Sequence, residues 1–209
     1  MLENPDIDDF GVTGNLSIMS AVLSTHQLIT PEEYLAGELV SEERHEFIAG
    51  VVHAMAGASA VHNTITHNLG GALYNHFRGK SCQPFGSDMK LRLNFGADTV
   101  FYYPDAMVVC DPTDDATHYR ERPILIIEVL SPETARVDQR EKLLAYRTLA
   151  SLEVYVLVDQ SQCRVTCYRL STGWTPEFLS GADELLVVPA LGWTIPLREI
   201  YERTGLVVG

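Results

Sequence analysis

The chain has 209 residues, which is enough for one domain that buries a core without disulfide bonds. Its 28 acidic and 15 basic residues give a formal net charge of −13. Because nucleic-acid-binding surfaces are normally basic, this balance excludes a general surface of that kind and leaves a local basic strip or bound metal ions to make such contacts. No apolar run is long enough to span a bilayer, and we expect no membrane contact.

The first twenty residues differ in composition from the rest of the chain. Residues 1–20 hold four acids and no base, with proline, glycine and asparagine interspersed. This composition predicts a flexible acidic extension, followed by a single domain over residues 21–209. The stretch lacks the basic and apolar regions of a signal peptide, so a cytoplasmic location is expected.

The four cysteines do not form a C-x-x-C pair. Cys163 and Cys167 share one predicted strand, in which four residues span roughly 13 Å, beyond the reach of a disulfide. We therefore expect free, partly buried thiols at Cys82, Cys110, Cys163 and Cys167.

The first part of the domain predicts a helix, a hairpin and a long helix. Thr30 is a suitable N-cap and Pro31 a suitable first helical residue, so a helix is expected to follow them. In RHEFIAGVVHAMAG, apolar residues on either side of Gly50 indicate a hairpin. Between residues 59 and 79, apolar residues recur every four positions, as on one face of a helix. These residues are Val61, Ile65, Leu69, Leu73 and Phe77.

The remaining segments are mostly strands. SDMKLRLNF alternates apolar and charged residues, and TVFYYPDAMVV is expected to be one further strand, interrupted by Pro104. RPILIIEVL predicts a strand buried on both faces, because its apolar run is too short for a helix. DQREKLLAYRTLA predicts a helix, and EVYVLVD and RVTCYRL predict two last strands. This order predicts an α/β fold, in which helices flank a mixed sheet.

Glu128 interrupts the most apolar of these strands. An ionised carboxylate among buried residues is costly unless it is paired, hydrogen-bonded or bound to a metal. Asp105 has a similar apolar setting on the preceding strand, so pairing of the two strands would bring both carboxylates to one end of the sheet. Two such oxygen ligands suit Mg²⁺ or Mn²⁺. The alternatives are a structural ion pair between Glu128 and an arginine such as Arg92, and a turn acid after proline for Asp105.

The same segments resemble a known family. In order, YYPDAMVV, PILIIEVLSPET, DQREKLLAYRTL and EVYVLVD resemble the Uma2 family (DUF820) of restriction-endonuclease-like proteins, which is placed in the PD-(D/E)xK nuclease superfamily. The resemblance runs from about residue 29 to the C-terminal strands. It implies a restriction-endonuclease-like mixed sheet and a metal-dependent endonuclease that hydrolyses phosphodiester bonds, with DNA as the expected substrate.

The resemblance also implies roles for particular residues. Asp105 and Glu128 would hold Mg²⁺ or Mn²⁺, and the carbonyl of Val129 would complete the protein ligands. Glu46 and His62 match further positions of the family pattern and would line the same cleft. A homodimer is suggested by the family analogy alone.

One position departs from the superfamily pattern. The E-x-K motif requires a lysine at position 130, where this chain has Leu130, so a lysine from elsewhere must serve. Lys142, one turn into the following helix, is the first candidate, and Lys90 is the second. Without such a lysine the rival hypothesis holds, namely an inactive nuclease-fold module that binds nucleic acid or protein.

Other chemistries lack their sequence patterns. His62, His67 and His76 fit no zinc-ligand spacing, and the acidic loop CDPTDDATH lacks the glycine and terminal glutamate of an EF-hand. The sequence contains no P-loop, dinucleotide-binding glycine fingerprint or nucleophile elbow. No nucleotide cofactor is therefore expected.

Overall fold

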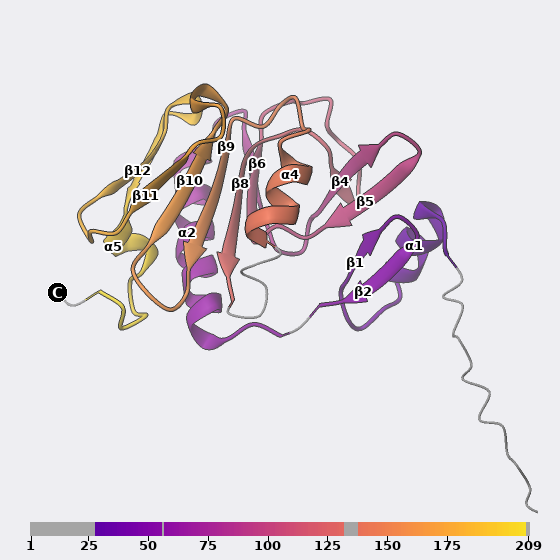
Figure 1. The fold of residues 1–209 in the computed structure, drawn as a ribbon, viewed down its shortest axis with the longest axis horizontal. Coiled ribbons are helices and arrows are strands. Elements are labelled where there is room, and N and C mark those ends of the chain that lie inside the picture. Colours follow the sequence, from indigo (N-terminus) through magenta and orange to yellow (C-terminus); the bar gives the residue numbers. More distant parts are fainter. Residues whose placement is uncertain (1–27, 56, 132–137, 208–209) are drawn as a thin grey trace, which may run out of the picture.

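The computed structural model describes residues 28–55, 57–131 and 138–207, and the predicted extension over residues 1–20 lies outside these ranges (Figure 1). Two larger sheets, a separate two-stranded sheet and several helices make up the molecule, which confirms the predicted α/β class. None of the helices in these ranges is both long enough and apolar enough to cross a bilayer.

A six-stranded sheet forms the centre of the molecule. Its strand order is β11 (Pro176–Leu179), β10 (Val165–Arg169), β9 (Val154–Asp159), β8 (Pro123–Leu130), β6 (Ala106–Val109), β3 (Gln83–Gly86). Strands β8 and β9 run parallel, and the other neighbouring pairs are antiparallel. In β8 every residue except Ile124 is buried, as its apolar run predicts for a strand with neighbours on both sides.

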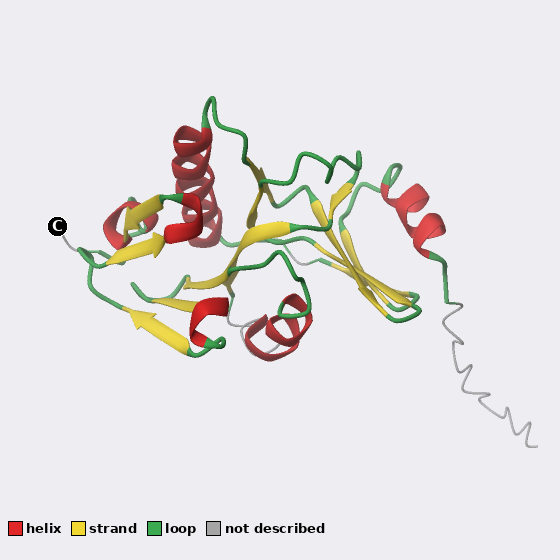
Figure 2. Ribbon diagram, turned by 90° about the horizontal axis from the view of Figure 1, so that it is seen from above, coloured by secondary structure: helices red, strands yellow, loops and turns green. Residues whose placement is uncertain are grey.

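Helices and hairpins cover both faces of this sheet. One face packs on α2 (Ala60–Phe77), α5 (Leu197–Ile200) and the hairpin formed by β12 (Leu185–Val188) and β13 (Trp193–Pro196). The other face packs on the π-helical turn η1 (Asp138–Lys142), on α4 (Leu143–Tyr146) and on the second large sheet. Two 3-10 turns, η2 (Leu170–Thr172) and η3 (Pro189–Leu191), lie in the connections. Figure 2 shows the long helix α2 and the shorter α4 on opposite sides of the strands.

The second sheet has five strands, and its two faces pack against different parts of the molecule. Its order is β2 (Val51–Ala54), β1 (His45–Ile48), β5 (Asp98–Tyr102), β4 (Lys90–Phe95), β7 (Tyr119–Arg120). Leu91, Leu93 and Tyr102 face the core that this sheet shares with α4. Phe47 and Phe101 point to the opposite face, because side chains alternate along a strand, and they pack there on helix α1 (Pro31–Glu38).

Helix α1 begins where the sequence predicts. The N-cap Thr30 accepts a hydrogen bond from the backbone N–H of Glu33 at 3.1 Å, and the Glu33 carboxylate accepts one from the N–H of Thr30 at 2.8 Å. This reciprocal capping box satisfies two N–H groups that a helix start leaves without partners. Tyr34 in the first turn then stacks on Phe47 and anchors the helix to the five-stranded sheet.

The prediction of one strand through Pro104 is wrong, because its two halves belong to different sheets. The chain leaves the five-stranded sheet after Tyr102 and enters the six-stranded sheet at Ala106, so β5 and β6 belong to different sheets. Proline has no N–H for a strand ladder and restricts the residue before it, which makes Pro104 a suitable crossing point. The crossing leaves Asp105 at the start of β6.

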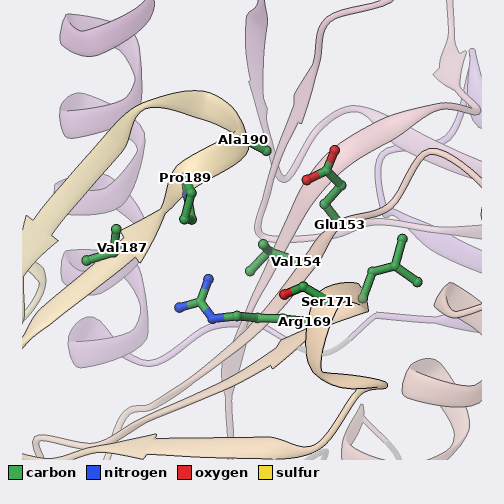
Figure 3. A pocket seen from close by; sticks show the side chains of 8 residues that line it. Glu153, Val154, Arg169, Ser171, Val187, Pro189 and Ala190 are labelled. Atoms are coloured by element: carbon green, nitrogen blue, oxygen red, sulfur yellow. The ribbon is translucent and has the colours of Figure 1, made fainter.

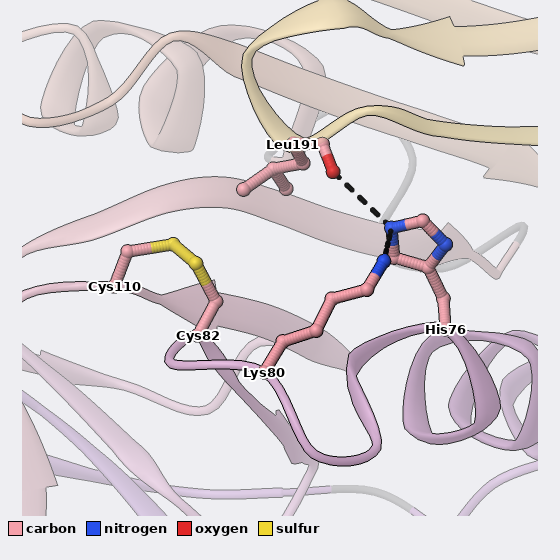
Figure 4. The surroundings of a disulfide bond; sticks show 5 residues. All are labelled: His76, Lys80, Cys82, Cys110 and Leu191. Carbon is pink, nitrogen blue, oxygen red and sulfur yellow. Dashed lines mark hydrogen bonds between the residues drawn. A yellow bond between two sulfur atoms is a disulfide. The ribbon is translucent and has the colours of Figure 1, made fainter.

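Two of the four expected free thiols are joined instead. Cys82 and Cys110 form a disulfide just outside the paired strands β3 and β6 (Figure 4). The antiparallel register of these strands brings the two cysteines side by side, which sequence spacing could not reveal. Cys163 and Cys167 are free, as expected, and burial raises the pKa of the Cys167 thiol to about 12.

Candidate functional site

Asp105 and Glu128 come from neighbouring antiparallel strands. Ala106 of β6 pairs with Ile127 of β8, so the register places Asp105 next to Glu128 at one end of the sheet. The Oδ2 atom of Asp105 accepts a hydrogen bond from the backbone N–H of Val129 at 2.7 Å. The strand pairing expected from the sequence for these two carboxylates is therefore present.

Glu128 is almost completely buried, with 4% of its surface exposed. Its Oε1 accepts a hydrogen bond from the Tyr146 hydroxyl at 2.7 Å and another from Lys142 Nζ at 3.4 Å. Arg92, the partner considered for a structural ion pair, instead lies with its Nε 3.8 Å from Glu121 Oε1. A lysine and a tyrosine of one helical segment, rather than Arg92, thus surround this carboxylate.

Lys142 is the last residue of η1, and Tyr146 is the last residue of α4. The helix predicted for this segment therefore begins as a π-helical turn and ends earlier than expected. Residues four apart lie on the same side of a helix, so both side chains point to the sheet. Lys142 is 8% exposed, and its Nζ also lies 3.1 Å from Glu46 Oε1 and 5.2 Å from the centre of the Tyr102 ring.

His62 contacts Asp105, and Glu46 contacts Lys142. His62 lies in the first turn of α2, which Ser59 caps, and its Nε2 is 3.4 Å from Asp105 Oδ2. Glu46 lies in β1 on the face turned toward Lys142. Two sets of contacts thus lie at this end of the sheet: His62 contacts Asp105, which is bonded to the backbone of Val129, and Lys142 contacts Glu46 and Glu128.

Lys90 lies on the other face of the five-stranded sheet. It alternates in β4 with Leu91, which faces the shared core, and its Nζ is 5.1 Å from the centre of the Tyr103 ring. Burial lowers the pKa of Lys90, and the nearby charge of Glu38 opposes this shift. The Tyr103 hydroxyl donates to Glu38 Oε2 at 2.6 Å, so Lys90 belongs to a cluster beside α1. The structure does not bring Lys90 to the two carboxylates.

The donors at the strand ends suit a hard divalent cation. Mg²⁺ is commonly held by one or two carboxylates and keeps several waters, and Asp105 and Glu128 supply two carboxylates. The N–H and the C=O of one strand residue point to the same side of the strand, so the Val129 carbonyl is turned toward the side on which its N–H meets Asp105. In the residues that the structure describes, no group of three or more His, Cys, Asp or Glu side chains is arranged to hold a metal ion, so a cation here would depend on two carboxylates, a backbone oxygen and water.

Sequence reasoning gave no role to two tyrosines in this site. Burial raises the pKa of Tyr146 well above its usual value, and the charge of Glu128 adds to this, so the hydroxyl stays protonated and donates. The Tyr102 ring lies edge-on to Tyr146, with 5.8 Å between ring centres. The four-residue spacing from Lys142 was the available signal for Tyr146, whereas Tyr102 reaches the site only through the second sheet.

A cavity of about 350 Å³ lies away from these residues (Figure 3). It is lined by Glu153, Val154, Arg169, Leu170, Ser171, Val187, Pro189 and Ala190. Val154 is the first residue of β9, whereas Glu128 pairs with Leu157 farther along that strand. None of the predicted site residues lines this cavity, so the carboxylate site is a separate feature at the strand ends.

Two relatives from one organism match most of the chain. The uncharacterized protein sll1609 of Synechocystis sp. is 37% identical over 151 residues, which cover 71% of this chain and 84% of the relative. The uncharacterized protein slr1290 of the same organism is 35% identical over 176 residues, which cover 83% of this chain and 91% of the relative.

A solved structure and a family model agree with these matches. The crystal structure of "a putative nuclease belonging to DUF820" from Anabaena variabilis has a TM-score of 0.67 and 18% identity, over 84% of this chain and 99% of that chain. At this identity the likeness shows the fold alone. The model of the Uma2 family, described as "Putative restriction endonuclease", matches residues 31–198, which include Asp105, Glu128 and Lys142. Because this match covers most of the 209-residue chain, the chain belongs to the Uma2 family.

Proposed function

We propose that the protein is a Mg²⁺- or Mn²⁺-dependent endonuclease that hydrolyses phosphodiester bonds, with DNA as its substrate. The observation that carries the proposal is the meeting of Asp105 and Glu128 at the paired ends of β6 and β8, with Lys142 Nζ 3.4 Å from Glu128 Oε1. The nuclease descriptions of the family and of the Anabaena variabilis structure support the same reaction class.

Each residue has a role that its position supports. A divalent cation at such a site would polarise a phosphoryl oxygen and acidify a bound water. Asp105 and Glu128 would hold the cation through their carboxylates, with the Val129 carbonyl as a further oxygen ligand. The Lys142 ammonium would offset the negative charge that builds on the phosphate, and Glu46 would hold that ammonium in place through their 3.1 Å contact.

The acidic charge of the chain bears on how substrate binds. With a net charge of −13, the protein repels a polyanion over most of its surface. A divalent cation held by Asp105 and Glu128 would neutralise the local negative charge at the place where phosphate must approach. Substrate binding should therefore be weak in EDTA and should improve with divalent ions, and it should fall steeply as salt rises.

The second candidate function is an inactive nuclease-fold module that binds nucleic acid or protein. Leu130 stands where the superfamily motif has lysine, and the ammonium of Lys142 is already engaged by two carboxylates. If these ion pairs persist in the presence of substrate, Lys142 would be structural. Calorimetric titration with Mn²⁺ separates the candidates, because an inactive module has no need to keep a metal site.

The test is a cleavage assay on single-stranded DNA, double-stranded DNA and RNA with Mn²⁺, Mg²⁺ or EDTA. The matched variant is Asp105→Asn, since an amide keeps an acceptor for the Val129 N–H and removes only the charge. We expect Mn²⁺-dependent cleavage that falls at least about 100-fold in this variant while the melting temperature stays close to that of the wild type. Cleavage that survives Asp105→Asn, or no metal-dependent cleavage of any substrate, would refute the proposal.

A further inference from the structure

The Tyr146 hydroxyl donates a hydrogen bond to Glu128 Oε1 at 2.7 Å. Tyr146 has none of its surface exposed. Its ring lies edge-on between Tyr102 and Tyr155, with ring centres 5.8 Å and 5.2 Å away. Rings packed on both sides leave the hydroxyl little freedom, so its position is set by the core rather than by the carboxylate it contacts.

Tyr146 and Lys142 act on the same oxygen of Glu128. Both donate to Oε1, the tyrosine from the end of α4 and the lysine from the end of η1. Two donors on one oxygen restrict rotation of the carboxylate group and so fix its direction. A tyrosine hydroxyl is protonated at neutral pH, so it serves as a donor to this carboxylate.

We infer that Tyr146 is a positioning residue for the proposed metal site, which fixes the direction of the Glu128 carboxylate. This inference rests on the proposed function and deepens it, because it assigns a role to a residue that does not itself touch metal or substrate. Donors behind a metal-binding carboxylate fix its direction, and losing one typically weakens metal binding 10- to 100-fold.

A purely structural role is the competing explanation. A fully buried tyrosine needs an acceptor, and Glu128 would serve even if no metal were ever bound. The structural role predicts that loss of the hydroxyl lowers stability and leaves metal affinity unchanged. The positioning role predicts that metal affinity falls in protein that remains folded.

The experiment compares Tyr146→Phe with Tyr168→Phe in the full chain. Tyr168 is a matched control because its ring stacks on Tyr155 in the same aromatic row, 6.1 Å between centres, without reaching Glu128. Mn²⁺ binding is measured by calorimetry and by the electron paramagnetic resonance signal of free Mn²⁺, and circular dichroism verifies folding. We expect at least about 10-fold weaker Mn²⁺ binding in Tyr146→Phe and a change below about twofold in Tyr168→Phe.

The outcomes separate this inference from the proposed function. Wild-type protein that binds Mn²⁺ together with a Tyr146→Phe variant of equal affinity would overturn the positioning role and leave the metal-dependent site intact. Wild-type protein that binds no Mn²⁺ would overturn the proposed function and this inference with it. If Tyr146→Phe fails to fold, a crystal structure of wild-type protein with Mn²⁺ decides. Tyr146 must then remain bonded to the Glu128 carboxylate while that carboxylate binds the ion, and any other arrangement overturns the inference.

Discussion

Replacing Lys142 by methionine should show how strongly one buried ammonium holds the site together. The Nζ atom lies 3.1 Å from Glu46 Oε1 and 3.4 Å from Glu128 Oε1, and the lysine side chain is 10% exposed. With an effective dielectric constant of about 20, each contact corresponds to about 5 kcal/mol of Coulomb attraction, much of which is offset by desolvation of the three charges. Methionine keeps the length and apolar character of the stem but removes the charge.

The net effect follows from what the substitution leaves behind. Without the ammonium, Glu46 and Glu128 stay close together as like charges, and Glu128 is buried. Removing one partner of a buried ion pair typically destabilises a protein by about 3–5 kcal/mol. Because the Glu46 side chain is 19% exposed and can turn toward water, we expect the lower end, about 3 kcal/mol at neutral pH in EDTA.

Urea unfolding followed by circular dichroism measures this change. Lys90→Met is the matched control, a buried lysine on the other face of the five-stranded sheet whose loss should change the free energy of unfolding by no more than about 1 kcal/mol. Adding Glu46→Gln to Lys142→Met should restore part of the loss, because one uncompensated carboxylate disappears. A Lys142→Met protein within about 0.5 kcal/mol of the wild type would refute the ion-pair reasoning. Cleavage should fall by orders of magnitude in Lys142→Met and stay close to wild-type in Lys90→Met.

Two further predictions concern the disulfide and the second buried lysine. Reduction of the Cys82–Cys110 disulfide, which closes a loop of sequence separation 28, should lower the free energy of unfolding by about 3–4 kcal/mol. Urea unfolding with and without dithiothreitol measures the change, and the control is a Cys82→Ala/Cys110→Ala variant, whose stability should not respond to the reductant. Burial lowers the pKa of Lys90 in the folded protein below its usual 10.5, so between the folded and unfolded pKa values the unfolded chain binds more protons than the folded one. The stability of the wild type relative to Lys90→Met should therefore rise as the pH approaches 10.5, and a difference that stays flat or falls there would contradict the lowered pKa.

The sequence was most informative where a local pattern had only one structural solution. The apolar run before Glu128 could only be a strand buried on both faces, and β8 has that position in the six-stranded sheet. The four-residue apolar repeat predicted α2, and the Thr30–Pro31 start predicted α1. In each case the signal lies within a few residues, so tertiary contacts had little opportunity to override it.

The features that the sequence did not predict depend on contacts between distant segments. Whether TVFYYPDAMVV belongs to one sheet or two depends on which strands β5 and β6 each pair with. The sequence of the segment itself does not reveal these partners. The disulfide has the same origin, because the register of β3 on β6 alone brings Cys82 to Cys110. Alternation along β4 shows that Lys90 points away from Leu91, but it does not show which face meets the carboxylates.

The departure at position 130 has a structural counterpart in the helical segment after β8. Glu128 and Leu130 lie two residues apart on one strand and so share a face, and Leu130 is buried there in the apolar core beside α4. A charged side chain at position 130 would have to enter that core. Lys142 instead reaches Glu128 from the helical segment that follows β8, where it is the last residue of a π-helical turn. Such turns widen a helix locally and are frequent at functional sites. The core therefore gains a leucine, while the Lys142 ammonium remains beside the Glu128 carboxylate. A search for function in this family should compare where the lysine ammonium lies in space, and not only whether a lysine stands in the E-x-K motif.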